Sequence, residues 1–349
     1  MVDPNAPPAS ASLLGMILKG KWEVIRELPR ENTTGGYFSH GYIVQSPSGE
    51  EAFLKALDFS RALKEPNFVE AMHHLTTAYL YERDLLWQCQ DKKMSRIVRA
   101  IDEGEEQVPG AFPPQVRYLV FELAEGDVRQ HMQLLEATDL AWLLRSLHHV
   151  ATGLHQLHGV GIAHQDMKPS NVLLFDNGRS SKVADLGRAS FRDYAALHDE
   201  FLIAGDAGYA PPELLYKQIA TEWSERRFAC DAYHLGSLCM FLFAQESMTP
   251  AILERLDREE HPRNWGGTYA DILPRVQAAF EDVLSALEPE LPESCREAIV
   301  VAVRQLCNPE PSRRGHPLTR RARGNPFSLE RYVSLFNHLA SRAEYGLLR

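Results

Sequence analysis

The chain has 349 residues, of which 44% are hydrophobic and 24% charged, the composition of an ordinary folded protein. Its net charge of −10 argues against a broad attraction to nucleic acid or to anionic membranes, so neither partner is expected. Five cysteines without a C-x-x-C pair indicate reduced thiols in a cytoplasmic protein, and no stretch predicts a secretory signal or a membrane-spanning helix.

The first part of the chain predicts a small sheet. Residues 1–15 begin with a segment rich in Pro, Ala and Ser, and we expect them to be a disordered lead-in. Alternating or apolar runs then predict strands at residues 22–28, 42–45, 52–57 and 97–101. A helix is expected at residues 66–90, between the third and fourth of these strands.

A glycine-bearing loop separates the first two strands. Gly35, Gly36 and Gly41 would let backbone N–H groups approach phosphate oxygens. An ordinary glycine-rich hairpin is the alternative, because the loop does not spell G-x-G-x-x-G.

The middle of the chain carries closely spaced polar groups. A helix predicted at residues 140–158 leads into a loop, and a short apolar strand follows at residues 172–175. The Asn177-Gly178 turn then predicts a hairpin that brings Asn171 and Asp185 close together. Carboxylate and amide oxygens side by side suit Mg²⁺ when phosphates supply its remaining ligands.

The loop motif carries a resemblance to a known family. The pattern His164-x-Asp166-x-Lys168-x-x-Asn171, followed by Asp185-Leu186-Gly187, resembles the catalytic loop and the magnesium loop of eukaryotic-type protein kinases. The resemblance implies a bilobal, protein-kinase-like α+β fold. Its N-lobe would be a small antiparallel β-sheet, residues 16–123, and its C-lobe, residues 124–349, would be mainly helical with a C-terminal helical extension.

The resemblance implies an enzyme that moves the γ-phosphoryl group of ATP to Ser or Thr hydroxyls of a protein substrate. Asp166 would orient the hydroxyl and accept its proton, while Lys168 would stabilise the phosphoryl group in flight. Asn171 and Asp185 would hold Mg²⁺. Lysine two residues after the aspartate is the arrangement of serine/threonine kinases.

The nucleotide-binding residues are implied in the same way. Lys55 would position the α- and β-phosphates, although a lone strand lysine is more often a solvated edge charge. Its carboxylate partner would be Glu82, which is favoured over Glu70 by the order of the segments that follow. Phe121 would guard the back of the adenine pocket, and the backbones of Glu122 and Ala124 would bind the edge of adenine.

Two more segments extend the resemblance. Residues 205–213 resemble the end of a kinase activation segment. Residues 310–314 resemble the family segment whose arginine pairs with the glutamate at the end of the activation segment. By that spacing Arg314 pairs with Glu213. Asp231 would hold the backbone of the catalytic loop.

Two of the departures from the family pattern bear directly on activity. Asp206 stands where a threonine is usual, and we expect its carboxylate to accept from Lys168 and to repel Asp166. Gln165 replaces the arginine that binds a phosphate on the activation loop, which weakens that clamp. The enzyme is therefore expected to work without activation-loop phosphorylation, so that phosphatase treatment, or replacement of Ser190 and Tyr194, leaves activity nearly unchanged.

Two rival interpretations remain open from the sequence. A pseudokinase that serves as a nucleotide-binding scaffold is favoured by the unusual glycine loop and by Asp206, but it would commonly lack Lys55, Asp166 or Asp185. A small-molecule phosphotransferase of related fold would share the loop motif but generally lack the pair of Glu213 and Arg314.

Overall fold

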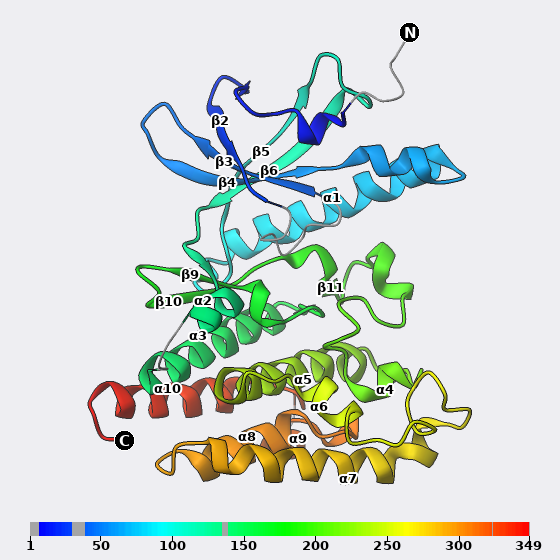
Figure 1. Ribbon diagram of the computed structural model, residues 1–349, viewed down its shortest axis with the longest axis vertical. Helices are drawn as coiled ribbons and strands as arrows, with labels where there is room; N and C mark the ends of the chain where they lie inside the picture. The colour runs from blue at the N-terminus through cyan, green and yellow to red at the C-terminus, as the bar shows by residue number, and fades with distance from the viewer. Residues whose placement is uncertain (1–6, 30–38, 135–138, 323, 349) are drawn as a thin grey trace. The chain divides into compact units, whose positions relative to one another are not determined.

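The computed structural model describes residues 7–29, 39–134, 139–322 and 324–348 (Figure 1). It has mixed α+β architecture, with an antiparallel sheet in its N-terminal part and helices in its C-terminal part, as the sequence predicts. The chain divides into two compact units. The first runs to Glu125 and includes Asp185–Gly187, and the second contains the remainder.

The first unit contains a six-stranded antiparallel sheet in the order β1-β2-β3-β4-β6-β5. Its strands are β1 (Ile17–Leu18), β2 (Trp22–Glu27), β3 (Ser39–Gln45), β4 (Glu51–Leu57), β5 (Ala100–Gln107) and β6 (Gln115–Glu122). Residues Ala52, Leu54 and Ala56 of β4 are buried in the core of this sheet. Since successive side chains of a strand alternate between faces, Lys55 points to the opposite face.

Helix α1 (Phe68–Asp91) packs on β5 and β6, where the Tyr79 hydroxyl lies 3.2 Å from the Tyr118 carbonyl oxygen. Asn67 caps its first turn by accepting a hydrogen bond from the Glu70 N–H. The connection from β4 contains a 3₁₀ turn, Phe59–Lys64, which takes up part of the chain between β4 and α1.

The expected disordered lead-in is wrong for the described residues 7–15. Ala9–Ala11 form a 3₁₀ turn, and Ala9 and Leu13 belong to the core of the sheet. The carbonyl oxygen of Ser10 accepts a hydrogen bond from the buried Tyr42 hydroxyl at 2.7 Å. Composition did not predict these contacts, because two buried apolar side chains and one buried hydrogen bond are enough to order a short segment rich in Pro, Ala and Ser.

The strand expected at residues 97–101 is also displaced. Ile97 and Val98 are buried, but β5 begins at Ala100 and continues through a run of acidic residues. Strand β5 is an edge strand of the sheet, so charged side chains along it reach solvent. Hydrophobicity alone therefore placed this strand too early.

The second unit is mainly helical. Its helices are α2 (Val128–Leu134), α3 (Leu140–His158), α4 (Pro212–Leu215), α5 (Trp223–Ala244), α6 (Met248–Leu253), α7 (Tyr269–Leu287), α8 (Arg296–Leu306), α9 (Pro317–Arg321) and α10 (Glu330–Glu344). Its short strands are β7 (Gly126–Asp127), β8 (Ile162–Ala163), β9 (Val172–Phe175), β10 (Ser180–Val183) and β11 (Ser190–Phe191). Strand β9 pairs with β10 and β7, and β8 pairs with β11.

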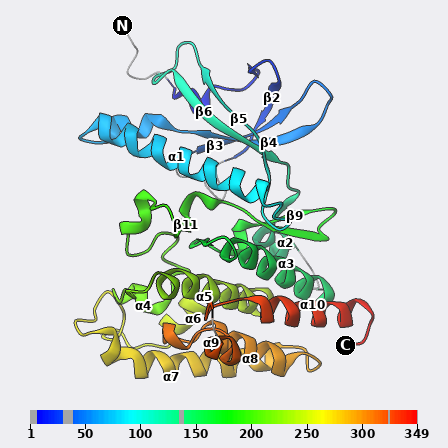
Figure 2. The same cartoon turned by 180° about the vertical axis from the view of Figure 1, so that it is seen from behind.

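Helix α10 accounts for the C-terminal extension and lies alongside α3 in both views (Figures 1 and 2). Arg145 of α3 binds Glu344 of α10 through two hydrogen bonds of 2.7 Å and Asn337 through a third. Phe336 and Leu339 of α10 are buried. The extension is thus an integral part of the helical unit.

Helix α5 lies at the centre of the second unit, and fifteen of its residues are buried. The Glu213 carboxylate that follows Pro212 receives both Nη atoms of Arg314, at 2.6 and 2.5 Å. The pairing predicted from the sequence is therefore confirmed. Arg314 is 0% exposed, so this ion pair is sealed from water.

His234 of α5 makes the stability of the second unit depend on pH. Burial lowers the pKa of His234 from 6.5 to about 4, although the nearby Asp231 carboxylate opposes this effect. His234 is therefore protonated in the unfolded chain below about pH 6.5, whereas in the folded protein it stays neutral until the pH approaches 4. Stability from this group is fully present above that pH and is lost as the pH falls towards 4.

The expected loss of unfolding free energy is about 2 kcal/mol between pH 7.5 and pH 5. Urea unfolding at both pH values, for the wild-type chain and for His234→Leu, measures it, because leucine fills similar space and does not titrate. The variant should show the smaller pH dependence, and equal pH dependence in the two proteins would contradict the prediction.

All five cysteines are reduced and buried. Burial raises the pKa of the Cys89 thiol to about 12, and it raises that of Cys230 and Cys307 well above the ordinary value. Among the described helices, none has the combination of length and apolar sequence that a bilayer crossing needs.

Candidate active site

In the first unit, Lys55 gathers two carboxylates around its ammonium group. Its Nζ lies 2.8 Å from Glu82 Oε1 and 3.3 Å from Asp185 Oδ1. Burial by itself would lower the pKa of Lys55, but Asp185 and Glu82 outweigh burial and raise it above the ordinary value. Lys55 is therefore a fixed cation, rather than the solvated edge charge of the alternative interpretation.

The carboxylate partner of Lys55 comes from the middle of α1. Glu82 is 7% exposed, whereas Glu70 is exposed in the first turn of α1 and accepts a hydrogen bond from the Asn67 amide. Asp185 adopts a left-handed backbone, with φ of 62°, which is rare for a residue with a side chain. Three predicted site residues, Lys55, Glu82 and Asp185, are thus brought together.

The residues predicted to meet adenine lie at the end of β6. Phe121 is buried against Phe53, with ring centroids 6.2 Å apart. The Glu122 N–H donates to the Arg99 carbonyl oxygen at 3.1 Å. Ala124 follows in the segment that ends the first unit. Gly35 and Gly36 lie outside the described residues.

In the second unit, Asp231 of α5 fixes the loop that carries Asp166. Its carboxylate accepts hydrogen bonds from the His164 and Gln165 N–H groups at 2.7 and 2.8 Å, and it lies 2.9 Å from His158 Nε2. Burial opposes ionisation of Asp231, but these hydrogen bonds and the two histidines lower its pKa below the ordinary value. The anchoring role that the sequence assigns to Asp231 is confirmed.

The loop needs this anchor because Gln165 has a φ of 66°, in the left-handed region. A non-glycine residue costs on the order of 1–3 kcal/mol there unless its surroundings hold it. The Gln165 side chain also donates to the Arg227 carbonyl oxygen at 2.8 Å. The backbone on both sides of Asp166 is thereby held in one conformation.

Asp166, Lys168 and Asp206 form a charged cluster. Lys168 Nζ lies 3.3 Å from Asp166 Oδ2 and 3.4 Å from Asp206 Oδ2. Burial would lower the pKa of Lys168, but the two carboxylates raise it. The Asp206 N–H also donates to Asp166 Oδ1 at 2.8 Å. The ammonium between the two carboxylates and this backbone bond offset the repulsion expected from Asp206.

The Asn171 side chain is held so that its amide oxygen can bind a cation. Its Nδ2 donates to the Asp166 carbonyl oxygen at 2.7 Å, which fixes the amide plane. Its Oδ1 is buried and has no hydrogen-bond partner within the part of the chain that the structure describes. A buried acceptor left without a donor is costly, so this oxygen fits a bound cation such as Mg²⁺.

The close approach of residue 205 to the catalytic loop requires glycine. A Cβ atom at Gly205 would lie 2.6 Å from both Asp166 Oδ1 and the Gln165 carbonyl oxygen. Gly205→Ala is therefore expected to push Asp206 away from Asp166 and to lower kcat of the reaction that the sequence resemblance implies by about 100-fold. Steady-state kinetics measures this loss.

Gly266→Ala provides the matched control, because a Cβ atom there would meet nothing within 4 Å. It should keep wild-type kcat. Equal kcat values in the two alanine variants would show that the contact at Gly205 does not matter for turnover.

Two residues of this region were missed from the sequence. Asp199 and Arg227 form a salt bridge of 2.9 Å, and Arg227 reaches Gln165. The available signal was the adjacent pair Arg226-Arg227 in the first turns of α5, but its partner lies 28 residues earlier in the chain. No local pattern identifies such a contact.

Comparison with known proteins gives a family match and several similar sequences. A family model described as the protein kinase domain matches residues 45–317, well over half of the chain. Calmodulin-binding receptor-like cytoplasmic kinase 2 of Arabidopsis thaliana is 31% identical over 49% of this chain and 40% of its own length. Serine/threonine-protein kinase PknA of Mycobacterium tuberculosis is 27% identical over 64% of this chain and 46% of its own length.

A third relative, serine/threonine-protein kinase ppk21 of Schizosaccharomyces pombe, is 30% identical over 34% of this chain and 23% of its own length. The chain thus spans less than half the length of each of these three relatives.

Proposed function

The chain belongs to the protein kinase domain family, and on that premise we propose that it transfers the γ-phosphoryl group of ATP to Ser or Thr hydroxyls of a protein substrate. The observation that carries the proposal is the loop of the second unit. There the carboxylate of Asp166 lies beside the Lys168 ammonium group, and among the described residues the buried Asn171 amide oxygen has no hydrogen-bond partner. The buried Asp231 carboxylate fixes the backbone that leads into Asp166.

Each group of that loop has a role in the proposed reaction. Asp166 accepts the proton of the substrate hydroxyl as its oxygen attacks phosphorus, and it orients that hydroxyl beforehand. Lys168 neutralises charge on the phosphoryl group during transfer, and its raised pKa keeps it protonated. Asp206 is a second carboxylate partner of Lys168 beside Asp166 and so limits the positions of its ammonium group.

ATP is proposed to bind through residues of the first unit. Lys55, fixed by Glu82, positions the α- and β-phosphates. Phe121 lines the adenine site, and the backbone groups of Glu122 and Ala124 bind the adenine edge. Gly35 and Gly36 remain proposed phosphate-loop residues.

Asn171 and Asp185 are the proposed ligands of Mg²⁺, which supplies charge neutralisation of the phosphates when it is bound. The lobes of the proposed enzyme are residues 16–123 and 124–349.

The proposed enzyme needs no activation-loop phosphorylation. Ser190 is the only Ser or Thr between Leu186 and Pro211, it is 0% exposed, and its hydroxyl donates to Asp199. A kinase could not reach it without unfolding this segment. Tyr194 is 61% exposed, but its ring is not required by any of the proposed roles.

A pseudokinase is the second candidate, and Asp206 is the observation that favours it. Its carboxylate competes with Asp166 for Lys168. However, the Lys55–Glu82 pair is intact and Asn171 keeps an unpartnered oxygen among the described residues. Both features serve a nucleotide bound with a metal ion, so we favour the active enzyme.

One assay separates the candidates. The full chain is incubated with γ-labelled ATP, Mg²⁺ and a basic carrier protein, beside Asp185→Ala. The expected result is label on Ser or Thr of the carrier or of the chain itself, lost in the variant. Nucleotide binding without transfer would support the pseudokinase, and label that appears on metabolites but never on protein would support a small-molecule phosphotransferase.

A further inference from the structure

The carboxylate of Asp199 is the centre of a hydrogen-bond network in the segment that precedes Gly205. Its Oδ1 accepts from Arg227 Nη2 at 2.9 Å and from the Ser190 hydroxyl at 2.5 Å. Its Oδ2 accepts from the Ala196 N–H at 2.7 Å. Three donors from two parts of the chain therefore converge on one acid that is only 20% exposed.

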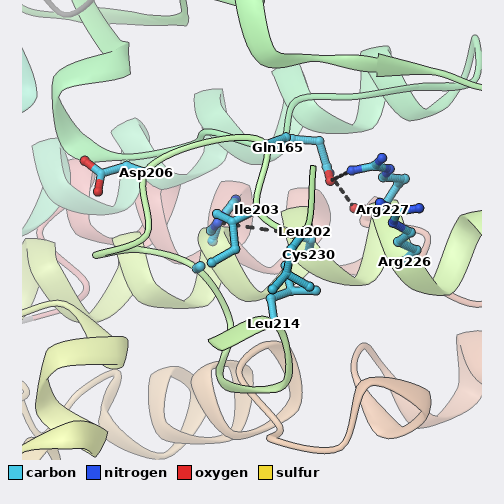
Figure 3. A pocket seen from close by; sticks show the side chains of 11 residues that line it. Gln165, Leu202, Ile203, Asp206, Leu214, Arg226, Arg227 and Cys230 are labelled. Carbon is cyan, nitrogen blue, oxygen red and sulfur yellow. Dashed lines mark hydrogen bonds between the residues drawn. The ribbon is translucent and has the colours of Figure 1, made fainter. Parts of the chain in front are cut away.

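The network continues from Arg227 to the catalytic loop (Figure 3). Arg227 Nη1 donates to Gln165 Oε1 at 3.2 Å, and Gln165 Nε2 donates back to the Arg227 carbonyl oxygen at 2.8 Å. Gln165 Nε2 also lies 3.1 Å from Asp231 Oδ1, the anchor of the catalytic loop. Asp199 is thus joined through Arg227 and Gln165 to the residue that fixes the backbone beside Asp166.

The charges explain why residue 165 is neutral. Arg226 lies beside Arg227, and its Nη2 donates to the Asp199 carbonyl oxygen at 2.7 Å. Burial and the charge of Arg226 lower the pKa of Arg227, and Asp199 offsets part of this effect. A third cation at residue 165 would be repelled by this arginine pair, whereas an amide both accepts from Arg227 and donates to Asp231.

The cavity beside these residues is too small to hold a phosphate group. The cavity lined by Gln165, Ile203, Arg226, Arg227 and His234 has a volume of about 10 Å³. That is room for about one water molecule. The anion that pairs with Arg227 in the structure is the Asp199 carboxylate.

We propose that Asp199, Arg227 and Gln165 form a permanent latch between the activation segment and the catalytic loop. In this latch the Asp199 carboxylate provides the negative charge that a regulated kinase acquires by phosphorylation. The inference rests on the proposed function and states how the enzyme stays active without phosphorylation. All three are positioning residues, because they act on Asp166 and Asp206 through the backbone.

The first test removes the charge without changing the size of the side chain. Asp199→Asn should lower kcat at least about 10-fold while KM for ATP changes less than about twofold, since the proposed ATP-binding residues lie in the first unit. Asp193→Asn makes the same chemical change at an exposed site of the segment and should keep wild-type kcat. Asp199→Glu restores the charge and should recover part of the loss.

The second test asks whether the residues act as one unit. In a cycle of Asp199→Asn and Arg227→Gln, the double variant should be no slower than the slower single variant, because either change opens the latch. Asp193→Asn combined with Arg227→Gln should be no slower than Arg227→Gln alone. Independent, multiplying losses in the first cycle would overturn the latch.

The third measurement does not depend on activity. Amide hydrogen exchange of residues 189–204 should rise at least about 10-fold in Asp199→Asn and stay unchanged in Asp193→Asn. Unchanged exchange in Asp199→Asn would overturn the latch even in a protein without transfer activity. If the wild-type chain transfers no phosphoryl group but exchange still rises in Asp199→Asn, the proposed function alone is overturned.

Discussion

Replacing Asp166 by alanine is expected to lower kcat for phosphoryl transfer by at least about 1,000-fold and to leave the Kd of ATP within about threefold of the wild-type value. The loss combines two effects. The proposed proton acceptor disappears, and of its two carboxylate partners among the described residues Lys168 keeps Asp206 alone, so its ammonium group moves away from the position it holds between them. ATP binding is retained because Lys55 and Glu82 are untouched.

Single-turnover kinetics and isothermal titration of a non-hydrolysable ATP analogue measure the two quantities separately. Asp282→Ala, which removes an exposed aspartate from α7, is the matched control and should behave as wild type. Full turnover in Asp166→Ala would remove Asp166 from the mechanism. Loss of ATP binding together with turnover would show that the change disrupts the fold instead.

Replacing Glu213 by glutamine is expected to lower the unfolding free energy by about 3–5 kcal/mol. The substitution keeps the shape of the side chain but leaves the Arg314 guanidinium, which is 0% exposed, without its counter-charge. Arginine stays protonated at ordinary pH values because its intrinsic pKa is very high, so Arg314 cannot relieve the cost by losing its proton. Urea unfolding followed by circular dichroism measures the loss.

The matched control is Glu281→Gln, which breaks an ion pair with Arg304 of 2.9 Å whose side chains are 55% and 46% exposed. That change should cost less than about 1 kcal/mol, because water screens the pair. The double variant Glu213→Met with Arg314→Met should be more stable than Glu213→Gln, since no buried charge is left unpaired. Equal losses in Glu213→Gln and Glu281→Gln would contradict the account.

The elements that the sequence predicted best are those with local end signals. Helix α3 spans Leu140–His158 as expected, because Asp139 caps its start and Gly159 follows its last residue. The hairpin of β9 and β10 is set by Asp176, Asn177 and Gly178, all with positive φ. The start of β5 and the packing of residues 7–15 depend on partners elsewhere in the sheet, which a local pattern does not contain.

In the candidate site, too, residues of one short motif could be predicted, whereas contacts between distant segments could not. Lys168 and Asn171 share one short motif with Asp166, so the sequence predicts their neighbourhood directly. The choice of Glu82 over Glu70 needed a count of segments across an inserted 3₁₀ turn, and the structure places Glu82 beside Lys55. Arg227 could not be predicted, because its contacts with Gln165 and Asp199 depend on the packing of α5 against two distant loops.

The burial of every cysteine has a practical consequence for labelling. Thiolates are the reactive form, so sulfhydryls that are buried and hard to ionise should resist maleimides while the protein stays folded. A single cysteine introduced by Tyr194→Cys, at a position that is 61% exposed, would then carry a fluorophore without background from the native thiols. Such a probe would report the motion of the segment around Asp199 in real time.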